Sequence, residues 1–161
     1  MAFKEYDRKP TFLDMELQRA FGQAQSRTQQ SLTEIDKIIN WVSIEKIVAE
    51  NYPVGQSEYG NKAYPPLLLL KASLIQKWFG IHSDPELEIQ INDRLSFKAL
   101  ISLPFSQPSP DHSIICRFRE RIGKETLEKI HHELLEQFSA LGFSLESGMA
   151  VDARVIRSAS R

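Results

Sequence analysis

The 161-residue sequence lacks most features that would place it in a specialised class of protein. Its single cysteine, Cys116, excludes an internal disulfide framework and a cysteine-rich zinc finger. The longest apolar run, Leu67 to Leu70, is far shorter than the roughly 18 residues that a membrane span needs. Twenty Lys and Arg balance 21 Asp and Glu, so global charge gives no case for nucleic-acid binding. The first ten residues mix both signs of charge, unlike a signal peptide. We expect a soluble, cytoplasmic protein with no membrane partner.

Most of the chain shows the caps, prolines and apolar spacing of helices. Ser31 and Glu34 fit a capping box, which predicts a helix from Ser31 with an apolar stripe continuing to Val48. Asn40 or Ser43 would split this segment into two shorter helices. Residues 1–30 are expected to form a weakly structured arm or a loosely docked helix.

The strongest helical signal runs from Pro66 to Gly80. Proline suits the first position of a helix, and the residues from 67 to 79 are apolar nearly all round, so we expect this helix to be buried. Further helices are predicted over 84–94, 96–100, 112–122 and 127–141, with Asp84 and Asp111 as caps. The sequence therefore predicts a mainly α fold, with one helical domain over residues 31–146.

The pattern changes after this domain. From Met149 to Ile156, residues alternate with the period of two that is typical of a strand. A lone strand cannot satisfy its own edges, so we expect residues 147–161 to begin a further domain. Asp152 lies in this strand, where it would either ligate a divalent metal together with other carboxylates or act as an edge charge that blocks aggregation.

The segment from His112 to Lys124 concentrates positive charge. It carries one carboxylate, Glu120, and four cations, which are Arg117, Arg119, Arg121 and Lys124. In a groove-reading helix of a helix-turn-helix-like element, such cations hold phosphates, and His112 and Ser113 near the amino end would lie closest to the bases. The helix amino terminus would also accept a phosphate. The alternative is a solvated helix whose cations balance the five glutamates of residues 125–146, and the residues alone leave both interpretations open.

Four blocks of sequence, taken in order, resemble bacterial insertion-sequence transposases of the insertion-sequence-five type. The first block is PLLLLKA at 66–72 with QKWFG at 76–80, and the second is SDPELE at 83–88 with DRLSF at 93–97. The third is PDHS at 110–113 with RFR at 117–119, and the last is VDARVI at 151–156. The similarity extends from about Ile35 to the end of the chain.

This resemblance implies a helical amino-terminal domain that grips DNA at terminal inverted repeats, followed by a ribonuclease-H-like catalytic domain. The family's catalytic domain holds Mg²⁺ with an Asp-Asp-Glu triad, and Asp152 matches the first aspartate as a catalytic and metal-binding residue. The second aspartate and the glutamate have no counterpart before Arg161, so we expect a truncated chain that binds DNA but does not cut it or hold a cofactor alone. Two alternatives are a helical interaction module that forms a homodimer and a stand-alone helix-turn-helix regulator.

Overall fold

The computed structural model describes residues 3–4, 10–23, 26–54 and 62–142, and these residues form a mainly helical fold, as predicted. The described helices are α1 (Phe12–Gln23), α2 (Arg27–Ile38), α3 (Trp41–Asn51), α4 (Pro66–Trp78), α5 (Asp84–Asp93), α6 (Leu95–Leu100) and α7 (His112–Ala140). Among the described residues the only β pairing is an isolated parallel bridge between Phe3 and Ala63. The strand predicted from Met149 lies outside the described residues. None of the described helices is long and apolar enough to cross a membrane.

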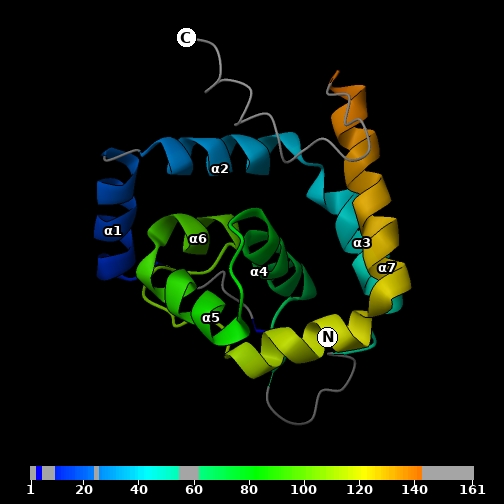
Figure 1. The fold of residues 1–161 in the computed structure, drawn as a ribbon. Helices are drawn as coiled ribbons and strands as arrows, with labels where there is room; N and C mark the ends of the chain where they lie inside the picture. Colours follow the sequence, from blue (N-terminus) through cyan, green and yellow to red (C-terminus); the bar gives the residue numbers. More distant parts are fainter. Residues whose placement is uncertain (1–2, 5–9, 24–25, 55–61, 143–161) are drawn as a thin grey trace.

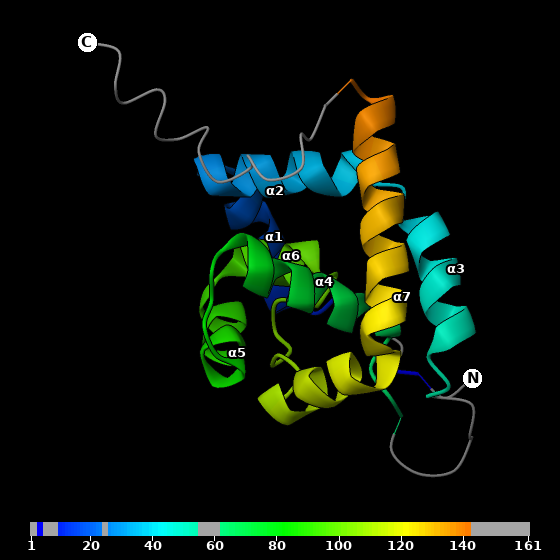
Figure 2. The ribbon, with the colours of Figure 1, turned by 45° about the vertical axis from the view of Figure 1, so that its right-hand side comes forward.

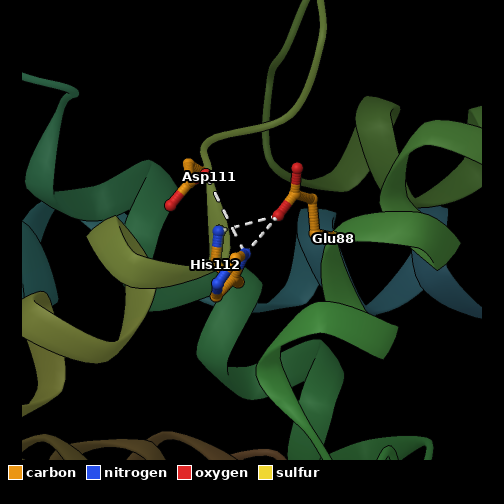
Figure 3. Close-up of side chains that lie close together, drawn as sticks. All are labelled: Glu88, Asp111 and His112. Atoms are coloured by element: carbon orange, nitrogen blue, oxygen red, sulfur yellow. Dashed lines mark hydrogen bonds and ion pairs between the residues drawn. The ribbon is translucent and has the colours of Figure 1, made fainter.

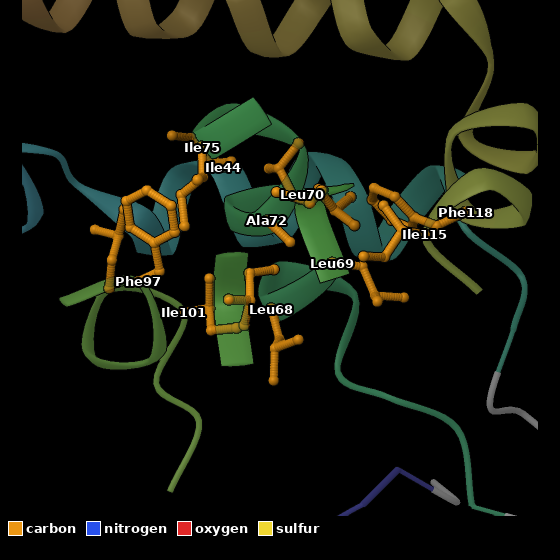
Figure 4. Close-up of a cluster of buried hydrophobic side chains, with 14 of the residues drawn as sticks. Ile44, Leu68, Leu69, Leu70, Ala72, Ile75, Phe97, Ile101, Ile115 and Phe118 are labelled. Carbon is orange, nitrogen blue, oxygen red and sulfur yellow. The ribbon is translucent and has the colours of Figure 1, made fainter. Parts of the chain in front are cut away.

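Helix α4 lies at the centre of the fold, with the other helices around it (Figure 1). It begins at Pro66 and ends before Gly80, whose φ of 62° suits a glycine. Leucine, alanine and isoleucine side chains of α4 form a core with Phe97 of α6 and with Phe118 of α7 (Figure 4). The prediction of a buried central helix is confirmed.

The charged side chain of Lys71, on the central helix, is buried beside this core. Its Nζ atom lies 2.7 Å from an Asp36 carboxylate oxygen on α2 and 4.3 Å from the ring centroid of Trp41. A buried cation needs such partners because desolvation otherwise costs several kcal/mol. Lys71 therefore joins the central helix to the α2–α3 junction.

The segment from Ser26 to Asn51 forms two helices, and its start differs from the prediction. Ser26, not Ser31, caps α2, because the Ser26 side chain accepts a hydrogen bond from the N–H of Gln29. Ser31 lies inside the helix, where its hydroxyl bonds to the carbonyl of Arg27. The predicted split at Asn40 is confirmed, since Asn40 caps α3. The boundary expected at residue 31 thus falls within α2.

Helix α1 is tied to the loop before α7 through Asp14. The carboxylate of Asp14 accepts hydrogen bonds from the hydroxyl and N–H of Thr11, at 2.6 and 3.2 Å, in a reciprocal cap. It also accepts bonds from the N–H and hydroxyl of Ser106, at 2.9 and 3.0 Å. For residues 1–30 we expected either a weakly structured arm or a loosely docked helix. Within this range, the described residues of α1 form a docked helix.

Helices α5 and α6 are joined by Arg94 alone, and residues 101–111 then lead to α7. Ser83 caps α5, one residue before the predicted Asp84, because its hydroxyl accepts a hydrogen bond from the N–H of Glu86. The connection from α6 to α7 is longer than the three- to four-residue turn of a DNA-binding helix-turn-helix. Helix α7 packs against α5, α4 and α3 instead. The helix-turn-helix-like element expected here therefore does not have its usual geometry.

Helix α7 bends sharply at Gly123, so that its two halves run in different directions (Figure 2). Gly123 has φ 74° and ψ 162°, a backbone conformation that is open essentially to glycine alone. The second half lies beside α3, where the Gln137 side chain accepts a hydrogen bond from the N–H of Asn40 and Glu133 accepts one from the hydroxyl of Ser43, both at 2.8 Å. The bend divides α7 into the two helices that the sequence predicts.

Candidate nucleic-acid interface

The first half of α7, residues 112–122, carries two exposed arginines next to a buried face. Ile115, Phe118 and Ile122 are buried in the core. Arg117 and Arg121 are exposed and lie four residues apart, so their side chains leave the helix on the same side. Neither arginine forms an ion pair with a carboxylate in the described part of the chain. Their charge is thus available to an anionic ligand.

The hydrogen bonds of these two arginines are with neutral groups, and the charge of Arg117 also acts over a longer distance on the Asp111 carboxylate. The Nε and Nη2 atoms of Arg117 donate to the carbonyl and hydroxyl of Ser113, at 3.2 and 2.8 Å. Arg121 lies beside the hydroxyl of Tyr52. Burial raises the pKa of Tyr52, and the nearby Arg121 guanidinium offsets part of that rise. Tyr52 in turn packs edge-on against Phe118, with ring centroids 5.1 Å apart.

Arg119 has a different environment from its two neighbours. Its guanidinium contacts both carboxylate oxygens of Asp84 and the side-chain oxygen of Gln76. Burial would raise the pKa of Asp84, but hydrogen bonds from Arg119 and Gln76 outweigh it and keep the pKa below its ordinary value. The charge of Arg119 is therefore balanced within the fold, where it joins α7 to α4 and α5.

Lys124 lies just beyond the bend in α7 and is almost fully exposed. Its Nζ atom is 3.5 Å from a carboxylate oxygen of Glu128, one turn further along the helix. Exposed pairs at this spacing contribute only about 0.3–0.5 kcal/mol, so a phosphate could displace Glu128 at little cost. Of the four predicted cations, Arg117 and Arg121 share one side of the helix, Arg119 is paired inside the fold, and Lys124 lies past the bend.

The amino terminus of α7 is occupied by two carboxylates (Figure 3). Asp111 accepts a hydrogen bond from the N–H of Ser113 at 2.8 Å, and Glu88 accepts one from the N–H of His112 at 2.9 Å. The Nδ1 atom of His112 also lies 2.9 Å from the same Glu88 oxygen. These bonds use the N–H groups that would hold a phosphate, so the anion site expected at this helix end is already filled.

The same bonds set the pKa values of the capping groups. The hydrogen bond to Glu88 raises the pKa of His112, and the hydrogen bonds from Ser113 lower the pKa of Asp111. One ligand atom from each of Glu88, Asp111 and His112 lies within 4.8 Å of the others, close enough to hold a metal ion. Their positions are explained by helix capping alone.

A pocket of about 490 Å³ opens beside Arg117 and Arg121, and we call it the basic pocket. Its charged lining residues are Lys4, Lys62, Arg117 and Arg121, and no carboxylate is among its described lining residues. Lys4 reaches it because its N–H donates to the carbonyl of Ala63 at 2.7 Å, which holds two distant segments together. Neither lysine stands out in the sequence, because Lys4 lies among charges of both signs and Lys62 has no other cation near it.

Comparison with known families decides where this chain belongs. The family model described as "Transposase domain (DUF772)" matches residues 20–121. The chain belongs to this family of transposase domains. Comparisons with curated proteins and with solved structures gave no match.

The matched part of the transposase domain contains the central helix and the two exposed arginines of the candidate interface. It runs from within α1 to Arg121, two residues before the bend at Gly123. Arg117, Lys62 and Tyr52 lie inside it, and Lys4 lies outside it. Asp152, the predicted catalytic and metal-binding residue, lies outside both the match and the described residues.

Proposed function

We propose that this transposase domain binds DNA through Arg117 and Arg121 at the edge of the basic pocket. The observation that carries the proposal is the pairing pattern of the cations in α7. Arg119 has an internal carboxylate partner, whereas Arg117 and Arg121 are exposed on one side and have none in the described part of the chain. Exposed cations that have no carboxylate partner within the fold are the groups that neutralise phosphates in protein–DNA complexes.

Helix α7 would lie along the DNA backbone rather than point its amino end into a groove. His112 is already hydrogen-bonded to Glu88. Ser113 is hydrogen-bonded to Asp111 through its N–H and to Arg117 through its hydroxyl. These bonds would have to break before either residue could contact a base. Phosphate contacts position a protein on the duplex without reading its sequence. We therefore expect this surface to contribute affinity, with most of the sequence preference arising elsewhere.

We also propose a finer identity for the protein to which this domain belongs. On the resemblance of the sequence blocks, the domain is part of an insertion-sequence-five type transposase that acts in DNA recombination in the bacterial cytoplasm. Its DNA targets would be the terminal inverted repeats of the element. Asp152 would be the first carboxylate of an Asp-Asp-Glu triad that would hold Mg²⁺, and the ion would supply activation of water or of a 3′-hydroxyl for attack on a phosphodiester.

The proposal is tested with the full chain and fluorescently labelled duplex DNA. Arg117→Ala/Arg121→Ala is expected to weaken duplex binding about tenfold or more, because two phosphate contacts are lost. The matched control is Arg19→Ala/Arg27→Ala, which removes two exposed arginines from α1 and α2, away from the interface. Equal loss in both variants, or no loss in either, would overturn the assignment. Selection from a random duplex library then tests end recognition, since it should enrich one element-end sequence.

A second candidate function is self-association through the far end of α7. Val42 and Leu141 are 62% and 53% exposed, and they flank the hydrogen bond that joins Asn40 to Gln137. Exposed apolar side chains grouped at one end of a molecule are typical of a protein-binding surface. If a homodimer uses this end, Val42→Glu should convert it to a monomer in light scattering while the helical content stays unchanged.

A further inference from the structure

The basic pocket differs from a flat phosphate-binding surface because it has aromatic and apolar walls. Tyr52 and Tyr64 line it together with Leu69 and Ile114. The Nζ atom of Lys4 lies over the ring of Tyr64, 3.7 Å from the ring centroid. Tyr52 packs edge-on against Phe118. The Tyr52 ring is thus held by packing within the fold, and the half-buried Tyr64 ring lies against a cation.

The charge of the pocket selects an anion. Lys4, Lys62, Arg117 and Arg121 come from three separate parts of the chain and converge on one cavity. Like charges gathered in this way repel one another, and the cost falls when an anion binds between them. A phosphate group fits this role best, because guanidinium and ammonium groups both hydrogen-bond its oxygens.

The shape of the pocket selects the kind of nucleic acid. In a duplex, bases are stacked inside the helix, so only phosphates on its convex surface would reach the rim of the pocket. A nucleotide at an unpaired strand end can enter a cavity, and aromatic side chains next to cations are the usual platform for single strands. The volume of about 490 Å³ lies within the range of small-ligand sites.

We propose that the basic pocket binds an unpaired nucleotide of a DNA strand, with its phosphate between the four cations and its sugar and base against the tyrosine and apolar walls. This inference rests on the proposed function, because Arg117 and Arg121 serve both the duplex surface and the pocket. It adds a preference for DNA ends that carry a single-stranded extension.

The test compares two labelled duplexes of the same sequence, one blunt and one with a three-nucleotide single-stranded extension. The full chain is expected to bind the extended duplex at least about fivefold more tightly. Lys4→Ala/Lys62→Ala, which leaves α7 intact, should bring the ratio of the two affinities close to one. Tyr64→Leu, which keeps every charge, should also lower the ratio. Arg19→Ala/Arg27→Ala should keep the ratio of the unchanged protein.

A ratio near one for the unchanged protein overturns the inference, and so does a ratio that the lysine variant leaves unaltered. Failure to bind either duplex overturns the proposed function instead. In that case a five-nucleotide single strand is titrated against the chain and its lysine variant. Binding that depends on the lysines supports the pocket, and no binding overturns it. If inorganic phosphate competes with the strand at equal concentration, the pocket binds an anion alone, and the nucleotide assignment is wrong.

Discussion

The guanidinium of Arg119 contacts both carboxylate oxygens of Asp84, in a pair whose side chains are 27% and 16% exposed. Arg119→Ala would leave the carboxylate largely buried without its cation. We expect the free energy of unfolding to fall by about 2–3 kcal/mol, somewhat less than for a fully buried pair. Chemical denaturation followed by circular dichroism measures this change.

Arg117→Ala is the matched control for this prediction. The Arg117 side chain is exposed and bonds only to Ser113 of its own helix, so its removal should change stability by less than about 0.5 kcal/mol. If both variants are equally stable, the internal role given to Arg119 is wrong. The two variants should rank in the opposite order when duplex binding is measured.

Asp14 is expected to stabilise the docking of α1 in a pH-dependent way. Its hydrogen bonds, chiefly those from Thr11 and Ser106, lower its pKa from 3.8 to about 2. The stabilisation is therefore complete above the ordinary carboxyl pKa and is lost as the pH falls toward 2. Asp14→Asn should destabilise the chain by about 1–2 kcal/mol at pH 7, as the loss of a helix cap does. A stability difference that does not shrink between pH 5 and pH 2 would contradict this account.

Gly123 is expected to be required for the bend in α7. An added Cβ atom would meet nothing within 4 Å, so the cost of Gly123→Ala comes from the backbone conformation alone. We predict a loss of about 1–3 kcal/mol in thermal or chemical denaturation. Gly22→Ala, at an exposed position of α1 that is equally free of contacts, should instead be neutral or stabilising. Equal effects of the two substitutions would show that the bend is not under conformational constraint.

His112 is expected to titrate above its ordinary pKa of 6.5, because Glu88 stabilises the protonated ring. Nuclear magnetic resonance of the ring protons measures this pKa directly, and Glu88→Gln should return it toward 6.5. A raised pKa means that the ion pair contributes stability below pH 6.5 and loses it as the pH rises through the folded-state pKa. An unchanged pKa in Glu88→Gln would show that Glu88 does not face the ring.

The sequence predicts local structure well where a single residue decides it. Four residues decide a helix boundary through the backbone next to them, and the structure has the boundaries that they predict. These residues are Pro66, Asn40, Asp111 and Gly123. Ser31 fits the capping pattern equally well, yet Ser26 caps the helix instead. Local pattern cannot choose between two serines that are both followed by residues with helical spacing.

The candidate interface depends on contacts between distant segments, which sequence spacing does not encode. Arg117, Arg119 and Arg121 look alike in the sequence, and only the position of Asp84 separates the internal arginine from the exposed pair. Lys4 joins the basic pocket through its bond to Ala63. The sequence thus identifies the cationic helix, and the fold decides which of its charges have a carboxylate partner and which are exposed to an anionic ligand.

The most direct test of this account is the salt dependence of duplex binding by the full chain. Each phosphate contact contributes about 0.9 to the slope of log affinity against log salt concentration. Arg117→Ala/Arg121→Ala should therefore lower the slope by about 2, whereas Arg119→Ala and Arg19→Ala/Arg27→Ala should leave it unchanged. An unchanged slope in the Arg117 and Arg121 variant, or an equal fall in the control, would contradict the assignment of these two arginines to DNA.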